Sequence, residues 1–199
     1  MAKNRQGQMI VKPVTESLAQ AARAASGKGL PPVHLWNPPF CGDIDMRIAR
    51  DGTWFYLGTP IGRAPLVRLF STILKREGDR HFLVTPVEKV GITVDDAPFV
   101  AVDVDRSDEG GEPVLTFTTN VGDRVAAGPG HEIRVTRDPK TGEPAPYLHV
   151  RAGLEALIDR KSFYRMAEIG DTVRHEGRDW FGFRSKGLFF PAIPADELT

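Results

Sequence analysis

The sequence has a single cysteine, no long apolar run and no net charge. Cys41 has no partner within the 199 residues, so no internal disulfide can form, which favours a reducing compartment. No stretch approaches the roughly 18 apolar residues of a membrane-spanning helix, and residues 1–30 lack the apolar core of a secretion signal. The 26 basic residues equal the 26 acidic ones, which disfavours a dedicated nucleic-acid binder. These absences predict a cytoplasmic protein.

The motifs of common catalytic and cofactor sites are missing as well. Neither G-x-x-x-x-G-K-[ST] nor G-x-G-x-x-G occurs, and no G-x-S-x-G presents a serine nucleophile. The five histidines lack metal-ligand spacing. Asp103-Val104-Asp105 does not continue into a calcium loop, since Asp108 and Val114 stand where glycine and glutamate are needed. We therefore predict no catalytic residue, no metal and no cofactor, and Cys41 is predicted to be a small buried residue.

The residues that are present predict strands with a few helices. Residues 17–25 are rich in alanine and predict a helix that follows an N-terminal tail. Residues 44–48 alternate between apolar and polar, as in a half-buried strand, and Asp51-Gly52 predicts a hairpin turn. A helix is predicted from Pro65 to Gly78. Its apolar face repeats at helical spacing: Leu66, Leu69, Phe70, Ile73 and Leu74.

The pattern changes after Gly91. Apolar residues up to Val135 stand at alternate positions between short polar turns, which predicts an antiparallel meander. A second helix is predicted to begin near Gly153, and its apolar face would include Leu154, Leu157 and Ile158 before a bend at residues 159–162. Strands are predicted near Trp180 and at residues 188–190.

A faint internal repeat runs through these elements. The matching positions share one constant offset: Tyr56-Leu57 with Tyr147-Leu148, Gly62 with Gly153, and Leu66-Val67 with Leu157-Ile158. Each copy is predicted to run from strand through a glycine turn and a helix to a second strand. Chance is the alternative, because such units are common. A true duplication would place a ligand cleft between two related halves.

Two arginines beside the predicted helix starts are the main candidates for ligand contact. Arg63 precedes the first helix and Arg151 the second, and an arginine next to a helix N-terminus suits a phosphate or carboxylate. The structural alternative is that each arginine caps carbonyls or stays solvated. Trp54 or Tyr56, with Tyr147 in the second copy, would add aromatic faces for a ring, unless Trp54 and Tyr56 belong to the core.

Glu88 and Lys89 lie in the predicted connector between the two halves. Their default interpretation is an ion pair between the halves. The alternative is that both side chains offer polar groups to a bound ligand.

The order and spacing of several segments resemble an uncharacterised bacterial family, domain of unknown function 1285. The likeness covers about residues 30–190 and rests on segments 41–48, 51–54, 60–63, 66–70, 85–90, 96–99, 146–151 and 154–157, with Arg160 and residues 163–164. The resemblance implies two subdomains with an internal duplication, the second similar to a pleckstrin-homology-like barrel. It implies no established activity, and it favours a nucleotide-like ligand at the interdomain surface with a role in signalling.

Together these features predict a β-rich α+β fold with three parts: a tail and helix at 1–29, a first subdomain at 30–90 and a second subdomain at 91–199. Two related strand–helix–strand subdomains are expected, the second with a curved antiparallel sheet. We predict a non-catalytic regulatory protein that binds a nucleotide-like or phosphorylated small molecule between them, without nucleic acid or membrane. An enzyme with an unrecognised site and a protein-interaction module are the alternatives. The predicted ligand-binding residues are Arg63, Arg151, Trp54, Tyr56, Tyr147, Glu88, Lys89 and Arg160.

Overall fold

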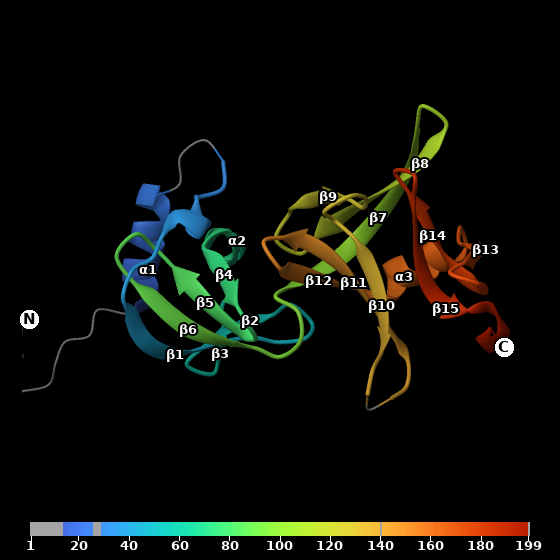
Figure 1. Cartoon of the computed structure of the whole chain (residues 1–199). Coiled ribbons are helices and arrows are strands. Elements are labelled where there is room, and N and C mark those ends of the chain that lie inside the picture. The colour runs from blue at the N-terminus through green and yellow to red at the C-terminus, as the bar shows by residue number, and fades with distance from the viewer. Residues whose placement is uncertain (1–13, 26–28, 140, 199) are drawn as a thin grey trace, which may run out of the picture. The chain divides into compact units, whose positions relative to one another are not determined.

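The computed structural model describes residues 14–25, 29–139 and 141–198, and these form a β-rich α+β fold (Figure 1). Its contacts divide the chain into two compact units. The N-terminal unit comprises the described parts of residues 1–46 and 55–93, and the C-terminal unit comprises 47–54 and 94–199. The described part contains three α-helices: α1 (Val14–Ala25), α2 (Ala64–Thr72) and α3 (Arg160–Ala167). None of these helices has both the length and the apolar character needed to cross a membrane.

The first six-stranded sheet belongs mainly to the N-terminal unit and has the order β3-β2-β1-β6-β5-β4. Its strands are β1 (Phe40–Ile48), β2 (Trp54–Tyr56), β3 (Thr59–Pro60), β4 (Leu74–Glu77), β5 (Arg80–Val84) and β6 (Lys89–Val94). The predicted N-terminal helix is confirmed as α1, which packs against α2. Leu18 and Ala22 of α1 are fully buried, because one face of this helix contributes to the core.

The helix predicted from Pro65 is confirmed as α2, but it is shorter than predicted. Phe70 and Ile73 are fully buried, whereas Leu66 and Leu69 are only half-buried. The helix ends at Thr72, where the hydroxyl groups of Ser71 and Thr72 donate to the helix carbonyls three residues back. Residues 74–77 then form β4, because they pair with β5 instead of continuing the helix. The helical spacing of Leu74 with Phe70 does not decide the structure here, and the pairing with β5 does.

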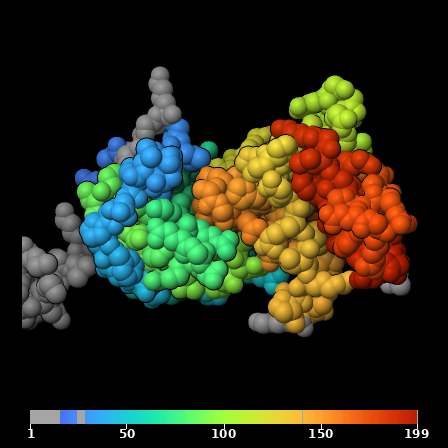
Figure 2. Space-filling model, viewed as in Figure 1, coloured from blue at the N-terminus to red at the C-terminus, as the bar shows by residue number. Residues whose placement is uncertain are grey.

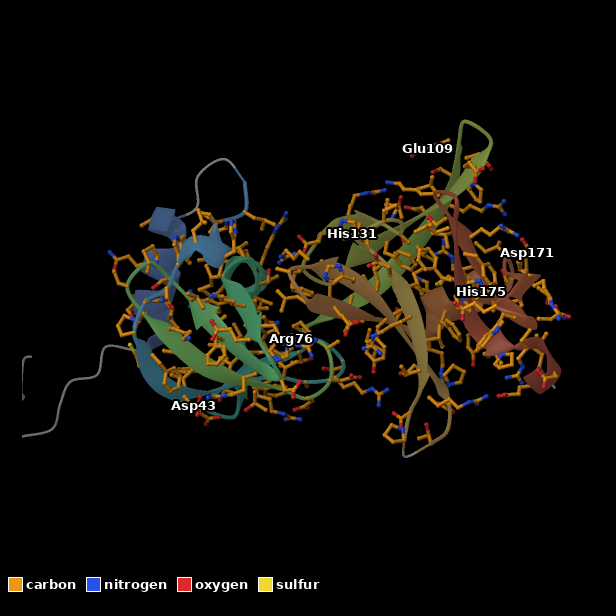
Figure 3. The ribbon with its side chains drawn as sticks, in the orientation of Figure 1. Asp43, Arg76, Glu109, His131, Asp171 and His175 are labelled. Atoms are coloured by element: carbon orange, nitrogen blue, oxygen red, sulfur yellow. The ribbon has the colours of Figure 1, made fainter. Side chains whose placement is uncertain are left out.

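The C-terminal unit contains a curled, half-barrel sheet of six strands in the order β10-β11-β12-β7-β8-β9. Its strands are β7 (Phe99–Glu109), β8 (Glu112–Thr119), β9 (Arg124–Ala126), β10 (Ile133–Arg137), β11 (Pro144–Arg151) and β12 (Leu154–Ile158). We predicted an antiparallel sheet, and this is wrong for one pair of strands, because β12 runs parallel to β7. The β7–β8 hairpin projects from this unit (Figure 2), and Glu109 marks its tip in Figure 3.

The second predicted helix start is wrong. Residues 154–158 form β12, in which Leu154, Ala156 and Ile158 are buried at alternate positions. The backbone of Ala152 and Gly153 has positive φ values of 46° and 75°, which makes a tight hairpin between β11 and β12. Helix α3 begins only at Arg160. The Asp159 carboxylate caps it by accepting a hydrogen bond from the Ser162 amide at 2.7 Å.

A three-stranded antiparallel sheet completes the C-terminal unit, with strands β13 (Asp171–His175), β14 (Arg178–Ser185) and β15 (Leu188–Pro194). Asp171 and His175 mark the first of these strands in Figure 3. Phe183 and Phe190 pair across β14 and β15 and are buried. The predicted burial of Cys41 is wrong, since this side chain in β1 is exposed.

Candidate functional site

The C-terminal unit has a surface hollow of about 370 Å³ between the start of α3 and the β10–β11 hairpin. We call it the α3 hollow. Its apolar wall comes from Pro144, Ala145 and Leu157 of the sheet together with Phe163 and Tyr164 of the helix. Two guanidinium groups, those of Arg50 and Arg160, also line it, as do the carboxylates of Glu143 and Asp159. The hollow therefore combines aromatic surface with two positive and two negative groups.

Arg50 reaches the α3 hollow from the turn that follows β1. Its Nε lies 3.1 Å from an oxygen of Asp96, and its Nη1 donates to Asp138 at 2.6 Å. The hydrogen bond to Asp138 raises the pKa of Arg50, and partial burial opposes this rise. Half of the Arg50 side chain stays exposed. The two carboxylates hold its fork in place.

Arg160 is the first residue of α3, and its Nη2 lies 2.9 Å from Oε2 of Glu143. Both side chains are largely exposed, at 69% and 60%, so solvent weakens this ion pair. Tyr164 stands one helical turn later and is 60% exposed. Phe163 packs edge-on against the buried Phe183, with the ring centroids 6.1 Å apart. The helix thus fixes one aromatic ring and presents another to solvent.

A second hollow of about 530 Å³ shares Arg50 and Ala145 with the first and includes Tyr147. The Tyr147 hydroxyl donates to Asp96 at 2.8 Å. Burial, followed by this hydrogen bond to a carboxylate, raises the pKa of Tyr147 to about 12. The Arg134 guanidinium lies over the Tyr147 ring at 4.1 Å and forms two hydrogen bonds with Glu155. Tyr147 is therefore held in a polar network of the C-terminal unit.

The two arginines singled out by the sequence have different surroundings. Arg63 belongs to the N-terminal unit, where it is exposed at the start of α2 and lines a third hollow with α1. Arg151 belongs to the C-terminal unit, where its Nη1 lies 2.5 Å from Asp123 and its guanidinium lies 4.8 Å from the Phe99 ring. It ends strand β11 and does not precede a helix, so the helix-start rationale is wrong for Arg151. Their placement in one shared site stays a prediction.

The remaining predicted residues also separate. Trp54 is only 1% exposed and is a core residue, which confirms the structural alternative for it, and Tyr56 is half-buried in β2. Lys89 pairs with Glu77 of the same unit at 2.9 Å and lies over the Phe82 ring. Glu88 and Lys89 both belong to the N-terminal unit, so the predicted ion pair between the halves stays a prediction, as does the alternative of ligand contact. Of the predicted set, only Arg160 lines the α3 hollow.

Sequence reasoning predicted none of the other residues of the α3 hollow as site residues, among them Arg50, Glu143 and Tyr164. Arg50 precedes the Asp51-Gly52 turn, and Glu143 lies between a glycine and a proline, so both positions look like ordinary surface turns. Tyr164 carries a usable signal, because the helical spacing of Arg160 and Tyr164 puts both on one face of α3. No pattern in the local sequence connects Arg50 with Glu143, Arg160 or Tyr164.

The polar chemistry of the α3 hollow comes from two guanidinium groups and the carboxylates beside them. No histidine is among the described residues that line it. The Asp159 carboxylate is committed to the α3 cap, and that of Glu143 is largely exposed. Across the described part of the chain, no group of three or more histidine, cysteine, aspartate or glutamate residues could hold a metal ion. The arrangement places two carboxylate-paired guanidinium groups beside an aromatic ring.

Two family models match consecutive parts of the chain. "Domain of unknown function (DUF1285), N-terminal domain" matches residues 31–97, and "Protein of unknown function (DUF1285), C-terminal domain" matches residues 98–192. The chain is similar to the crystal structure of a DUF1285 family protein from Silicibacter pomeroyi DSS-3. Their identity is 67% and their TM-score is 0.82, with 91% of this chain and 97% of that chain covered.

A second crystal structure, of a DUF1285 family protein from Shewanella baltica OS155, is 30% identical with a TM-score of 0.49. That match covers 62% of this chain and 90% of the other. The search of the curated proteins found no match to the chain.

Proposed function

We propose that this chain, which belongs to the DUF1285 family, is a non-catalytic regulatory protein that binds a nucleotide-like or other phosphorylated small molecule. The site that we propose is the α3 hollow of the C-terminal unit. The observation that carries the proposal is the convergence of Arg50 and Arg160 with the exposed ring of Tyr164 around one hollow.

The α3 hollow suits such a ligand in size and in chemistry. Its volume of about 370 Å³ lies at the lower end of the range for small-molecule sites. A planar guanidinium fork donates two parallel hydrogen bonds to a phosphate or carboxylate. Tyr164, four residues after Arg160 on the same helix, offers a face on which a base can stack. Apolar residues of β11 and β12 shield the inner wall.

Binding without turnover would fit a role in signal transduction in the cytoplasm, and we propose that role for the protein. We further propose that the two units arose by duplication. In each unit a hairpin precedes a helix, and a second hairpin follows it: α2 with β4 and β5, and α3 with β13 and β14. The curled sheet of the C-terminal unit with α3 beside it supports a pleckstrin-homology-like form for that half.

The test is a calorimetric titration of the protein with a panel of nucleoside monophosphates, beginning with adenosine monophosphate. Arg160→Gln should weaken binding about tenfold or more, because a charge-assisted hydrogen bond contributes roughly 1.5–3 kcal/mol. Tyr164→Ala should weaken it about two- to tenfold through lost stacking, worth roughly 0.5–1.5 kcal/mol. Both side chains are exposed, so the melting temperature of the free protein should change little.

Arg174→Gln is the matched control, because Arg174 is an exposed, ion-paired arginine of β13 that does not line the α3 hollow. It should bind the nucleotide as the unchanged protein does. The proposal is wrong if no nucleoside monophosphate binds, or if Arg160→Gln and Arg174→Gln have equal effects.

A further inference from the structure

The described parts of the connection between β10 and β11, residues 138–139 and 141–143, carry two carboxylates that both engage arginines of the α3 hollow. Asp138 opens the connection and pairs with Arg50, with 2.6 Å between Oδ2 and Nη1. Glu143 closes it and pairs with Arg160, with 2.9 Å between Oε2 and Nη2. Figure 1 shows this connection at the far end of the β10–β11 hairpin. The two arginines of the hollow thus both pair with carboxylates of the same connection.

Backbone hydrogen bonds hold the two ends of the connection together. The Gly142 amide donates to the Asp138 carbonyl at 2.8 Å, and the Asp138 amide donates to the Glu143 carbonyl at the same distance. The Thr141 amide donates to the Asp138 carboxylate at 3.1 Å. These hydrogen bonds tie Asp138 to residues 141–143, and the carboxylates of Asp138 and Glu143 each reach an arginine of their own.

The two ion pairs differ in how easily another anion can replace the carboxylate. The Asp138 side chain is only 10% exposed and also accepts a hydrogen bond from its own turn. The Glu143 side chain is 60% exposed, and its arginine is 69% exposed. An exposed pair is stabilised weakly, by up to about 1 kcal/mol, because water competes for both charges. A phosphate that approaches the hollow would therefore displace Glu143 before it displaces Asp138.

We propose that Glu143 is an internal competitor for the ligand: its carboxylate occupies Arg160 in the free protein and leaves when the anionic group of the ligand binds. Asp138 keeps Arg50 in place as part of the wall. This inference rests on the proposed function of the α3 hollow. Glu143 would lower the affinity for every anion that takes its place at Arg160, because the same ion pair must be broken each time.

The experiment compares the affinity of adenosine monophosphate for the full chain and for Glu143→Gln by calorimetry. Glu143→Gln should bind about two- to fivefold more tightly, the factor expected when an exposed ion pair no longer has to be broken. Binding of adenosine, which has no phosphate, should not change. In an Arg160→Gln background, the Glu143→Gln change should have no effect, since the contested arginine is gone.

Glu112→Gln is the control for net charge, because Glu112 is an exposed residue of the β7–β8 hairpin that does not line the hollow. It should leave the affinity unchanged. One outcome separates the two proposals: adenosine monophosphate binds, Arg160→Gln weakens its binding, and Glu143→Gln has the same affinity as Glu112→Gln. In that case Glu143 is not a competitor for the ligand, and the proposed function stands. If no nucleoside monophosphate of the panel binds either protein, both proposals are wrong.

Discussion

Ser185 connects backbone groups that lie far from it in the sequence. Its hydroxyl donates to the Ala127 carbonyl at 2.7 Å and accepts from the Leu115 amide at 2.9 Å, and the side chain is fully buried. This oxygen therefore bridges the Leu115 amide of β8 and the Ala127 carbonyl just after β9. A small polar residue that looks unremarkable in the sequence is thus a structural link between strands.

Ser185→Ala should reduce the free energy of unfolding by about 1–3 kcal/mol, because it leaves a buried donor and a buried acceptor unsatisfied. Urea unfolding followed by circular dichroism measures this change. Ser107→Ala is the control, since Ser107 is exposed in β7, and it should change stability by less than about 0.5 kcal/mol. Equal effects of the two substitutions would contradict the structural role of Ser185.

Tyr147 should make the stability of the protein depend on alkaline pH. Its pKa is raised to about 12 in the folded protein, against about 10 in an unfolded chain. The stabilisation is therefore fully present below about pH 10 and is lost as the pH rises from about 10 towards 12, where the unfolded state releases the proton first. Unfolding free energies of the unchanged protein and of Tyr147→Phe should converge over this range.

The measurement is urea unfolding of both proteins between about pH 8 and pH 11, since the difference between them removes the contributions of lysine and of the other tyrosines. A difference that stays constant across this range would show that Tyr147 has an ordinary pKa in the folded protein.

At the scale of elements, two buried glycines bring neighbouring strands close together. A Cβ on Gly182 of β14 would overlap the Phe190 carbonyl of β15 and lie 2.7 Å from the Phe189 ring. A Cβ on Gly91 of β6 would meet the Asp43 carboxylate instead. The first obstacle is backbone within a sheet, whereas the second is the end of an exposed side chain that can rotate away.

Gly182→Ala should therefore destabilise the protein by roughly 1–3 kcal/mol, as overpacking does. Gly91→Ala should cost less than about 1 kcal/mol, because it disturbs only the exposed pair of Asp43 with Arg80. Thermal unfolding of the two variants in parallel gives the comparison. A larger loss for Gly91→Ala would mean that Asp43 cannot move away.

The elements also show where sequence patterns were ambiguous. Residues 154–158 satisfy both a helical and an alternating pattern, and a short apolar run does not distinguish them. The partners decided the outcome: β11 on one side and β7 on the other complete the hydrogen bonds of a strand. Residues 74–77 form a strand for the same reason, because they pair with β5.

At the scale of the whole molecule, the compact units are not continuous in the sequence. Residues 47–54 belong by their contacts to the C-terminal unit, although residues on both sides of them belong to the N-terminal unit. Arg50 pairs with Asp96 and Asp138, and the Asn120 side chain donates to the Gly52 carbonyl. A boundary drawn at one position along the chain therefore omits part of the C-terminal unit.

Local sequence determined much of this protein by itself. Periodicity and turn residues predicted α1, the start of α2, the hairpin at Asp51-Gly52 and a β-rich second half, because these features depend on neighbours within a few residues. The order and spacing of motifs identified the family. The sequence also presented Arg160 as a candidate for ligand contact.

Only the tertiary structure decided which charges meet. Arg50 and Asp138 are separated by 88 positions, and no pattern in the sequence connects them. Arg151 and Lys89 looked available for a ligand, but the folded chain gives them Asp123 and Glu77 as partners. The physical reason is that an ion pair or a strand register is set by groups brought together across the fold, whereas a local pattern reports only the periodicity of its own segment.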